Sequence, residues 1–162
     1  MTDVAIPLLH TKLHRPRPSS DLVVRPRLLE LLDRGLDGQV TLVSAPAGFG
    51  KTTLVSSWIE GNMASPSPSP AAWLSLDESD SDLTVFLIYF IAALRTISPG
   101  ACDETLGLLQ APRQAPLKYL TTTLSNEIQR LPGRFILVLD DYHLIRGEAI
   151  SNLLNELLHH WP

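Results

Sequence analysis

Apolar side chains recur along the chain in two patterns, which predict alternating helices and strands. Residues Leu28–Leu36 are apolar at the three- and four-residue spacing of one helix face, and Pro26 suits a first helical turn. Short apolar runs such as Gln39–Ala45 instead predict strands buried on both faces. The predicted helices are Leu28–Leu36, Lys51–Glu60, a segment within Asp77–Ile97, Leu117–Leu131 and Gly147–His159. The third of these begins with acidic residues that can cap it. The predicted strands are Gln39–Ala45, Ala71–Leu76 and Arg134–Ile145.

Strands that alternate with helices predict an α/β fold with a parallel sheet and flanking helices. Residues 1–20 are rich in proline and basic side chains and predict an extended arm, while 21–162 predict one domain. The stretch "GNMASPSPSP", residues 61–70, predicts an exposed connector, because alternating proline supports neither a helix nor a sheet ladder. Proline and glycine also predict a broken loop over residues 98–115.

Composition narrows the classes of protein. The net charge of −4 lacks the basic excess typical of nucleic-acid binding. The single cysteine, Cys102, excludes an internal disulfide framework and favours an unreactive thiol in a reducing compartment. The apolar run Leu83–Leu94 is shorter than the roughly 20 residues that span a bilayer, and the N-terminus lacks a signal-like apolar core. We therefore expect a soluble, cytoplasmic chain without a membrane partner.

The stretch "APAGFGKT", residues 45–52, matches the phosphate-loop (Walker A) pattern G-x-x-x-x-G-K-[ST] except that Ala45 replaces the first glycine. Gly48 and Gly50 allow the backbone to turn its N–H groups inward, and Lys51 would reach the β- and γ-phosphates. The Thr52 hydroxyl would bind Mg²⁺. The alternative is an ordinary strand–turn–helix with a chance lysine. The candidate nucleotide-binding residues here are Ala45, Pro46, Ala47, Gly48, Phe49, Gly50, Lys51, Thr52 and Thr53.

A second motif, "FILVLDDYH", ends the last predicted strand with Asp140 and Asp141. Ligands bind at the carboxyl ends of strands in open α/β sheets, so Asp140 is the candidate Walker B ligand of Mg²⁺. Asp141 is the candidate general base that acts on water, and Asp141 and Lys51 are the candidate catalytic residues. The alternative is an acidic turn that arose by chance. ATP is favoured over GTP, because the nearest guanine-type element, Thr11–His14, lacks its aspartate.

Four stretches together resemble MalT-like regulators, which are large ATP-binding, LuxR-family transcriptional activators in the STAND class of P-loop ATPases: "TKLHRPRP…VVRPRLLELL", "VTLVSAPAGFGKTTLVSSW", "AAWLSLDESDSDLTVFLIYFIAAL" and "FILVLDDYHLI". The resemblance implies an ASCE-type P-loop fold and ATP with Mg²⁺ as ligands. It also implies that Val24 and Arg25 approach the adenine, although Arg25 could equally be a solvated charge. Trp73 and Asp77 match a signature of the group; we expect Trp73 in the core, and Asp77 either caps the next helix or lies near the γ-phosphate.

In such regulators a fourth strand lies between the phosphate-loop strand and the Walker B strand, and inducer- and DNA-binding regions follow. We therefore expect a fragment, truncated before that strand, in which Val40–Ser44 and Phe135–Leu139 either face an empty slot or close against each other. The implied function is an ATP-binding, slowly hydrolysing switch that controls self-association, with no direct DNA contact. The alternatives are a catalytically inactive binding remnant or an unrelated small P-loop enzyme.

Overall fold

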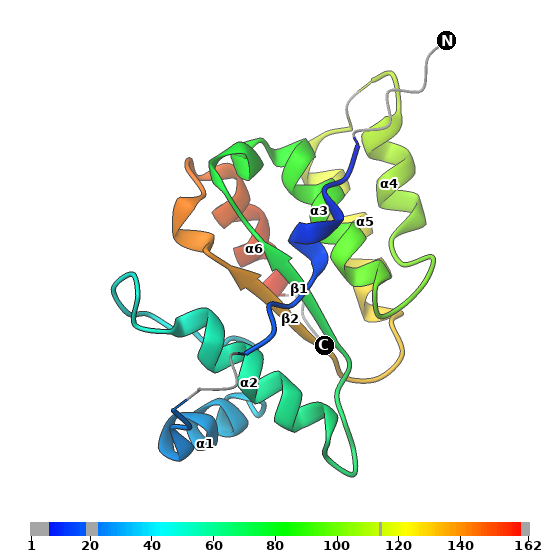
Figure 1. Ribbon diagram of the computed structural model, residues 1–162. Helices are drawn as coiled ribbons and strands as arrows, with labels where there is room; N and C mark the ends of the chain where they lie inside the picture. The colour runs from blue at the N-terminus through cyan, green and yellow to red at the C-terminus, as the bar shows by residue number, and fades with distance from the viewer. Residues whose placement is uncertain (1–6, 19–22, 114, 160–162) are drawn as a thin grey trace. The chain divides into compact units, whose positions relative to one another are not determined.

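The computed structural model describes residues 7–18, 23–113 and 115–159, which form two compact units (Figure 1). One unit takes in the chain up to His14 and from Ala71 onward, and the other takes in Arg15–Pro70. The parallel sheet lies in the first unit. Residues 1–6 and 19–20 of the predicted arm lie outside the described residues.

Two parallel strands form the sheet that the structure describes. Strand β1 (Ala71–Ser75) pairs with β2 (Ile136–Asp140) in a register that sets Ala71 opposite Ile136 and Ser75 opposite Asp140. Both strands were predicted from their apolar runs, and the α/β class with a parallel sheet and flanking helices is confirmed. Because the strands are parallel, their carboxyl ends, Ser75 and Asp140, lie at the same edge.

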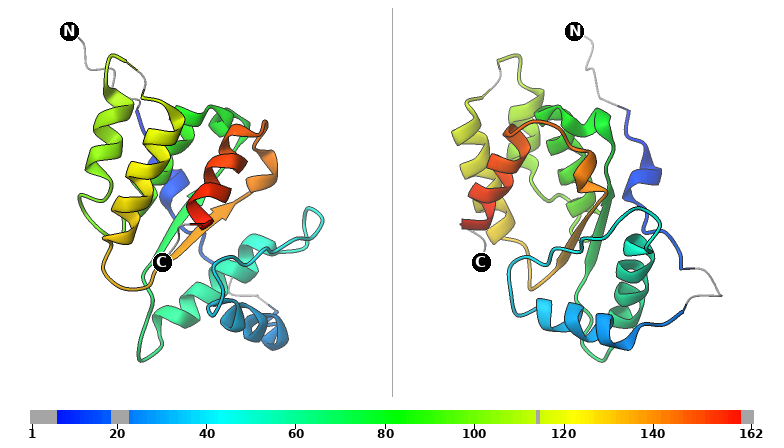
Figure 2. Two further views of the ribbon diagram at one scale, coloured as in Figure 1. Left: turned by 180° about the vertical axis from the view of Figure 1, so that it is seen from behind. Right: turned by 90° about the vertical axis from the view of Figure 1, so that its left-hand side faces the viewer.

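Four helices of the first unit enclose its apolar core: α3 (Leu83–Arg95), α4 (Asp103–Gln110), α5 (Leu117–Gln129) and α6 (Ala149–His159). Helices α5 and α6 cover one side of the sheet (Figure 2). Asp82 caps α3 by accepting from the N–H groups of Thr84 and Val85, as the acid-led pattern predicts. The fully buried core side chains are Leu74 of β1, Phe86, Leu87, Phe90, Ile91 and Leu94 of α3, Leu124 and Ile128 of α5, and Ile150, Leu153 and Leu157 of α6.

Residues 8–13 pack against the rest of this unit. A short 3₁₀ helix, η1 (His10–Leu13), lies against β1 on the side away from α5 and α6 (Figures 1 and 2). Leu8 and Leu13 pack against the apolar core. Lys12 is buried, so part of the proline-rich N-terminal stretch is integrated into the fold.

The prediction of a broken loop over residues 98–115 is wrong in its middle, where α4 forms. Gly107 lies inside this helix, and glycine weakens a helix by about 1 kcal/mol relative to alanine without preventing it. Tertiary contacts outweigh that cost, because Thr105 is fully buried and Leu106 and Leu109 pack against the core.

The second unit contains α1 (Pro26–Gly35) and α2 (Lys51–Met63), as predicted, although α2 extends three residues beyond Glu60. The indole N–H of Trp58 donates to Asp33 Oδ1 at 2.7 Å, which joins α2 to α1. The buried Ser56 hydroxyl of α2 donates to the Pro16 carbonyl, and Arg15 donates to the Ser56 carbonyl. These bonds fix the middle of α2 within the unit.

The predicted strand Gln39–Ala45 is wrong: residues 40–46 have no helix or strand conformation. Val40 is 61% exposed and Leu42 is 85% exposed, which is the opposite of a strand buried on both faces. A strand is stable only when its backbone groups pair with a neighbour, and the described elements of this unit are helices. The predicted alternative, in which this segment pairs with Phe135–Leu139, is likewise absent from the described residues, since β2 pairs with β1.

Among the residues that the structure describes, no helix combines the length and apolar character needed to cross a bilayer.

Candidate functional site

The loop Ala45–Gly50 leads directly into the first residue of α2. Gly48 and Gly50 have φ angles of 81° and 77°, in the left-handed region that glycine adopts without steric cost. A Cβ atom built at either position would meet nothing within 4 Å, so the backbone conformation, and not crowding, requires glycine. Left-handed residues in such loops turn N–H groups toward one point, which is the geometry of an anion-binding nest.

The Lys51 side chain returns over this loop. Its Nζ donates to the carbonyl oxygens of Ala45 and Pro46 at 2.8 and 3.2 Å. Gly50 is the N-cap of α2 and has no side chain with which to cap the helix. The loop therefore combines an ammonium group held by neutral carbonyls with the positive end of a helix dipole, and both favour an anion such as phosphate.

The remaining candidates of the second unit lie at the beginnings of its two helices and in the loop. Thr52 and Thr53 are half-buried in the first turn of α2. Val24 and Arg25 are exposed at the beginning of α1, where Arg25 is the N-cap residue. Phe49 is also exposed, at the tip of the loop. The role of Val24 and Arg25 near an adenine stays a prediction.

The acidic pair lies in the first unit. Asp140 is the last residue of β2, and its Oδ1 accepts the N–H of Asp141 at 3.1 Å. Asp141 adopts a φ of 56°, in the left-handed region that aspartate tolerates better than most residues, and is the N-cap residue of a short 3₁₀ helix, η3 (Tyr142–Leu144). Its carboxylate lies 3.9 Å from Nδ1 of His143, whose side chain is exposed. The two carboxylates thus lie at the carboxyl edge of the sheet.

A second acidic turn adjoins the first at this edge. The N–H of Leu76 donates to the Asp140 carbonyl at 3.0 Å, and the chain then turns into a 3₁₀ helix, η2 (Glu78–Ser81). Asp77 caps η2 through the N–H of Ser79, whereas the longer helix that follows, α3, is capped by Asp82. Trp73, on the adjoining strand, is 3% exposed and therefore a core residue, as predicted.

Lys12 supplies the counter-charge for this turn, a feature that the sequence analysis missed. Its Nζ lies 2.8 Å from Asp77 Oδ2 and 2.7 Å from Asp80 Oδ2. Hydrogen bonds from Lys12 and then from Ser79 lower the pKa of Asp77 to about 2. Burial opposes the charged form of Lys12, but the hydrogen bonds and charges of Asp77 and Asp80 outweigh it and raise its pKa. Lys12 and Asp80 are 68 residues apart in the sequence, so no local pattern identifies the pair.

The two motifs belong to different units, the phosphate loop to Arg15–Pro70 and the acidic pair to the unit that contains the sheet. Among the described residues, no group of three or more His, Cys, Asp or Glu side chains is arranged to hold a metal ion. A single oxygen ligand such as Asp140 nevertheless suits Mg²⁺, which typically takes only one or two protein carboxylates together with water and phosphate oxygens.

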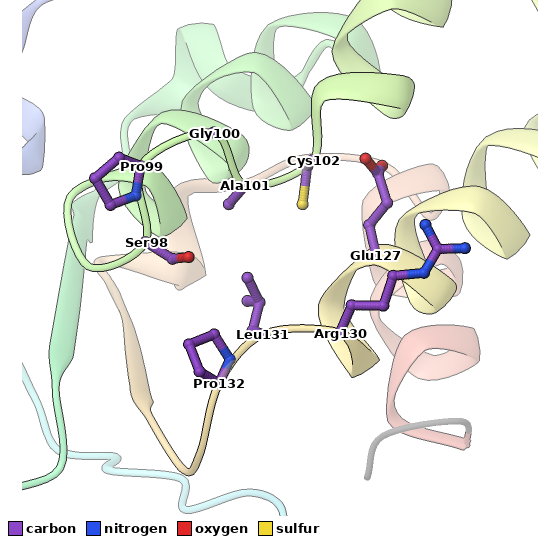
Figure 3. Close-up of a pocket in the computed structure, with 9 residues that line it drawn as sticks. All are labelled: Ser98, Pro99, Gly100, Ala101, Cys102, Glu127, Arg130, Leu131 and Pro132. Carbon is purple, nitrogen blue, oxygen red and sulfur yellow. The ribbon is translucent and has the colours of Figure 1, made fainter.

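A pocket of about 250 Å³ lies elsewhere in the first unit, between the segment that leads into α4 and the end of α5 (Figure 3). Cys102 and Glu127 line it, but both have structural explanations. The Glu127 carboxylate accepts the N–H groups of Glu104 and Thr105 and the Thr105 hydroxyl, at 2.9, 3.0 and 2.6 Å. Burial, followed by the charge of Glu127, raises the pKa of the Cys102 thiol to about 12. The sequence predicts an unreactive thiol, and its burial in the structure agrees with that prediction.

Fold and site together define an α/β protein with a glycine loop that opens a helix and an acidic pair at the carboxyl edge of a parallel sheet. The chain is similar to regulators described as "HTH-type transcriptional regulator MalT". It is 38% identical over 155 residues to those of Yersinia pestis (strain Pestoides F) and Yersinia pseudotuberculosis serotype O:1b, and 36% identical to that of Yersinia enterocolitica serotype O:8. These matches cover 96% of this chain, which is therefore MalT-like.

The chain spans about 16% of the length of these relatives. No protein-family model matches it.

Proposed function

We propose that this chain is the nucleotide-binding part of a MalT-like transcriptional regulator and that it binds ATP with Mg²⁺ at the loop of residues 45–53. The observation that carries the proposal is the loop itself. Gly48 and Gly50 take left-handed conformations, and the Lys51 ammonium lies over the loop at the start of α2. The MalT similarity along nearly the whole chain supports the same function, as well as a P-loop type of fold and a cytoplasmic location.

Each residue has a role that follows from its chemistry. Residues 45–53 surround the phosphates and, apart from Pro46, which has no N–H, donate to them through backbone N–H groups. Lys51 exchanges its carbonyl partners for phosphate oxygens, which are stronger partners because they are charged. Thr52 and Asp140 are the Mg²⁺ ligands. Mg²⁺ supplies neutralisation of the phosphate charge when bound. Asp141 orients water and accepts its proton, and Val24 and Arg25 contact the adenine.

Binding without turnover is the second candidate, and one observation favours it. Hydrolysis needs a rigidly held phosphate loop, and residues 40–46, which lead into the loop, have no strand conformation. The chain would then report the presence of ATP or ADP through self-association. DNA and inducer recognition would belong to other parts of the full-length regulator, of which this chain spans a small share.

The test is isothermal calorimetry with ATP and ADP in the presence of Mg²⁺. We expect Lys51→Ala to abolish binding, because it removes the charge that faces the phosphates. Lys118→Ala, at an exposed position of α5, is the matched control and should bind like the wild type. Asp140→Asn should weaken binding only when Mg²⁺ is present, with the exposed Asp37→Asn as its control.

Hydrolysis is measured separately by phosphate release. Turnover that Asp141→Asn abolishes while binding remains would support the switch, and binding with no turnover in the wild type would favour the second candidate. Phosphate transfer to an acceptor other than water would indicate an unrelated P-loop enzyme. Binding that Lys51→Ala leaves intact, or no binding by a folded wild type, would contradict the proposal.

A further inference from the structure

We propose that Lys12 is a positioning residue for the acidic edge of the sheet: its ammonium holds η2 at the end of β1 and, through η2, the segment that follows Asp140. Its relevance to nucleotide turnover rests on the function proposed above. Lys12 comes from the N-terminal segment, outside both motifs, and nothing in the phosphate-loop or Asp-Asp pattern points to it.

The ammonium is enclosed by acceptors. Lys12 Nζ lies 2.8 and 2.7 Å from the two oxygens of Asp80 and 2.8 Å from Asp77 Oδ2. The ring of Tyr89, on α3, lies with its centre 4.9 Å from the same nitrogen, in the range of a cation–π contact. The Tyr89 hydroxyl also accepts the N–H of Leu9 at 3.2 Å. The turn that contains η2 and helix α3 thus both contribute to the place where Lys12 is held.

The two carboxylates differ in their need for this charge. The Asp80 side chain is fully buried, whereas that of Asp77 is half-exposed and can be solvated by water. Asp80 also closes the capping box of η2, because its Oδ2 accepts the Asp77 N–H at 2.8 Å. Removal of the ammonium would leave a buried carboxylate without a counter-charge inside that cap, so η2 would have to rearrange.

A rearrangement of η2 would also displace the segment after β2, because the two are joined by hydrogen bonds. The N–H of Arg146 donates to Ser81 Oγ at 2.9 Å, and its guanidinium contacts Glu78 at 2.7 Å. On the other side of the turn, Leu76 donates to the carbonyl of Asp140. Residues 140–146, which include the acidic pair, are therefore bonded to both ends of the turn that Lys12 holds.

The variants separate positioning from general stability. Lys12→Met removes the charge but keeps the length of the side chain, and Lys12→Arg restores the charge. The double variant Lys12→Met/Asp80→Asn removes both partners of the buried pair, so it keeps the fold testable if Lys12→Met alone fails to fold. Lys118→Met, at an exposed lysine of α5, is the matched control.

The first readout is hydrogen exchange on the full chain without nucleotide. Lys12→Met and the double variant should exchange at least about ten-fold faster in the peptides that cover 76–82 and 140–146, while α5 and α6 keep wild-type rates. Lys12→Arg should recover most of the protection. Uniform acceleration throughout the first unit, or a change confined to residues 8–14, would overturn the proposal, because Lys12 would then only stabilise the fold or tether its own segment.

The second readout is Mg²⁺–ATP turnover at saturating nucleotide. A loss of about ten-fold in kcat, with Kd within about two-fold of the wild type and rescue by Lys12→Arg, is expected of a group that positions the acidic edge but does not bind the phosphates. Unchanged kcat in a Lys12→Met protein with faster exchange at 140–146 would overturn the link to turnover. A wild type that neither binds nor hydrolyses ATP would contradict the proposed function, and hydrogen exchange would still decide the role of Lys12.

Discussion

Individual charges determine how the carboxyl edge of the sheet responds to its surroundings. Lys12 is shared between a fully buried carboxylate, Asp80, and a half-exposed one, Asp77. A surface ion pair contributes little because water screens it. Loss of one partner of a buried pair typically costs about 3–5 kcal/mol, because it leaves an uncompensated charge. The Lys12–Asp80 contact is therefore the dominant interaction of the cluster.

Asp77 makes the stability of the first unit depend on pH in the acid range. Hydrogen bonds from Lys12 and Ser79 lower its pKa from 3.8 to about 2. A carboxylate whose pKa is lower in the folded state stabilises the fold above the unfolded pKa, and this contribution disappears as the pH falls through the folded pKa. Asp77→Asn should therefore flatten the dependence of unfolding free energy on pH between about 4 and about 2.

Urea titrations followed by circular dichroism at several pH values measure this effect, with Asp37→Asn as the control. Lys12 has the opposite pH dependence, because its pKa is higher in the folded state than the ordinary value of 10.5. Its contribution to the unfolding free energy is fully present below pH 10.5 and is lost as the pH rises through the folded-state pKa. If the unfolding free energy of the wild type and of Asp77→Asn depended on pH in the same way between about 4 and about 2, a lowered pKa of Asp77 would be contradicted.

The residues of the phosphate loop could be predicted from the sequence, whereas those of the Lys12 cluster could not. The left-handed conformations of Gly48 and Gly50 are local properties of a glycine-bearing loop before a helix. Lys12 and Asp80 meet only because η1 packs on β1, across 68 residues of chain. The sequence does not distinguish a lysine that will be buried from one that will be exposed, so the Lys12–Asp80 pair can be identified only from the tertiary structure.

Among the elements, α4 shows how a distant side chain can specify a helix that its own sequence leaves ambiguous. The segment contains Gly107 and follows Pro99 and Gly100, which is why a loop was predicted. Glu127 of α5 supplies what the local sequence lacks, because its carboxylate accepts hydrogen bonds from the first turn of α4. The N-cap position itself is occupied by Cys102, which gives no side-chain cap.

Glu127→Gln should therefore destabilise the first unit. An amide keeps one acceptor oxygen but directs an NH₂ group at backbone donors, so either the part-buried N–H of Glu104 or the buried N–H of Thr105 loses its partner. A buried donor left without a partner costs about 1–3 kcal/mol. Urea unfolding followed by circular dichroism measures the loss, and Glu156→Gln, at an exposed position of α6, should be neutral. Equal stability of the two variants would show that Glu127 does not cap α4.

The predicted strands divide by whether a partner is available. The apolar runs that become β1 and β2 pair with each other in register. The run Val40–Ser44 has the same β-forming composition but no strand conformation, and Leu42 is exposed. Strand preference reflects a half-buried, paired surface more than an intrinsic property of the backbone, so composition alone could not decide which of the three runs would form strands.

At the scale of the whole molecule, the apolar core is divided unequally between the units. Strand β1 and helices α3, α5 and α6 share one contiguous cluster of buried side chains. In the described part of the other unit, the buried hydrophobic residues are Leu32, Trp58 and Ile59. A two-stranded sheet alone is marginal in water, so the helices that pack on it account for most of the stability of the first unit.

This inequality predicts where the chain opens first and what a nucleotide would change. Local opening occurs where few apolar contacts are buried, so amides of α1 and α2 should exchange faster than those of α3 and α5.

A ligand that binds only the closed form at 100 times its Kd should slow that exchange about 100-fold. Hydrogen exchange with and without Mg²⁺–ATP should therefore show new protection in residues 45–63, and Lys51→Ala should remove it. If α2 is as protected as α3 without nucleotide, the second unit is stable independently of its ligand. If ATP instead protects only α3 and α5, the nucleotide does not bind at the loop that precedes α2.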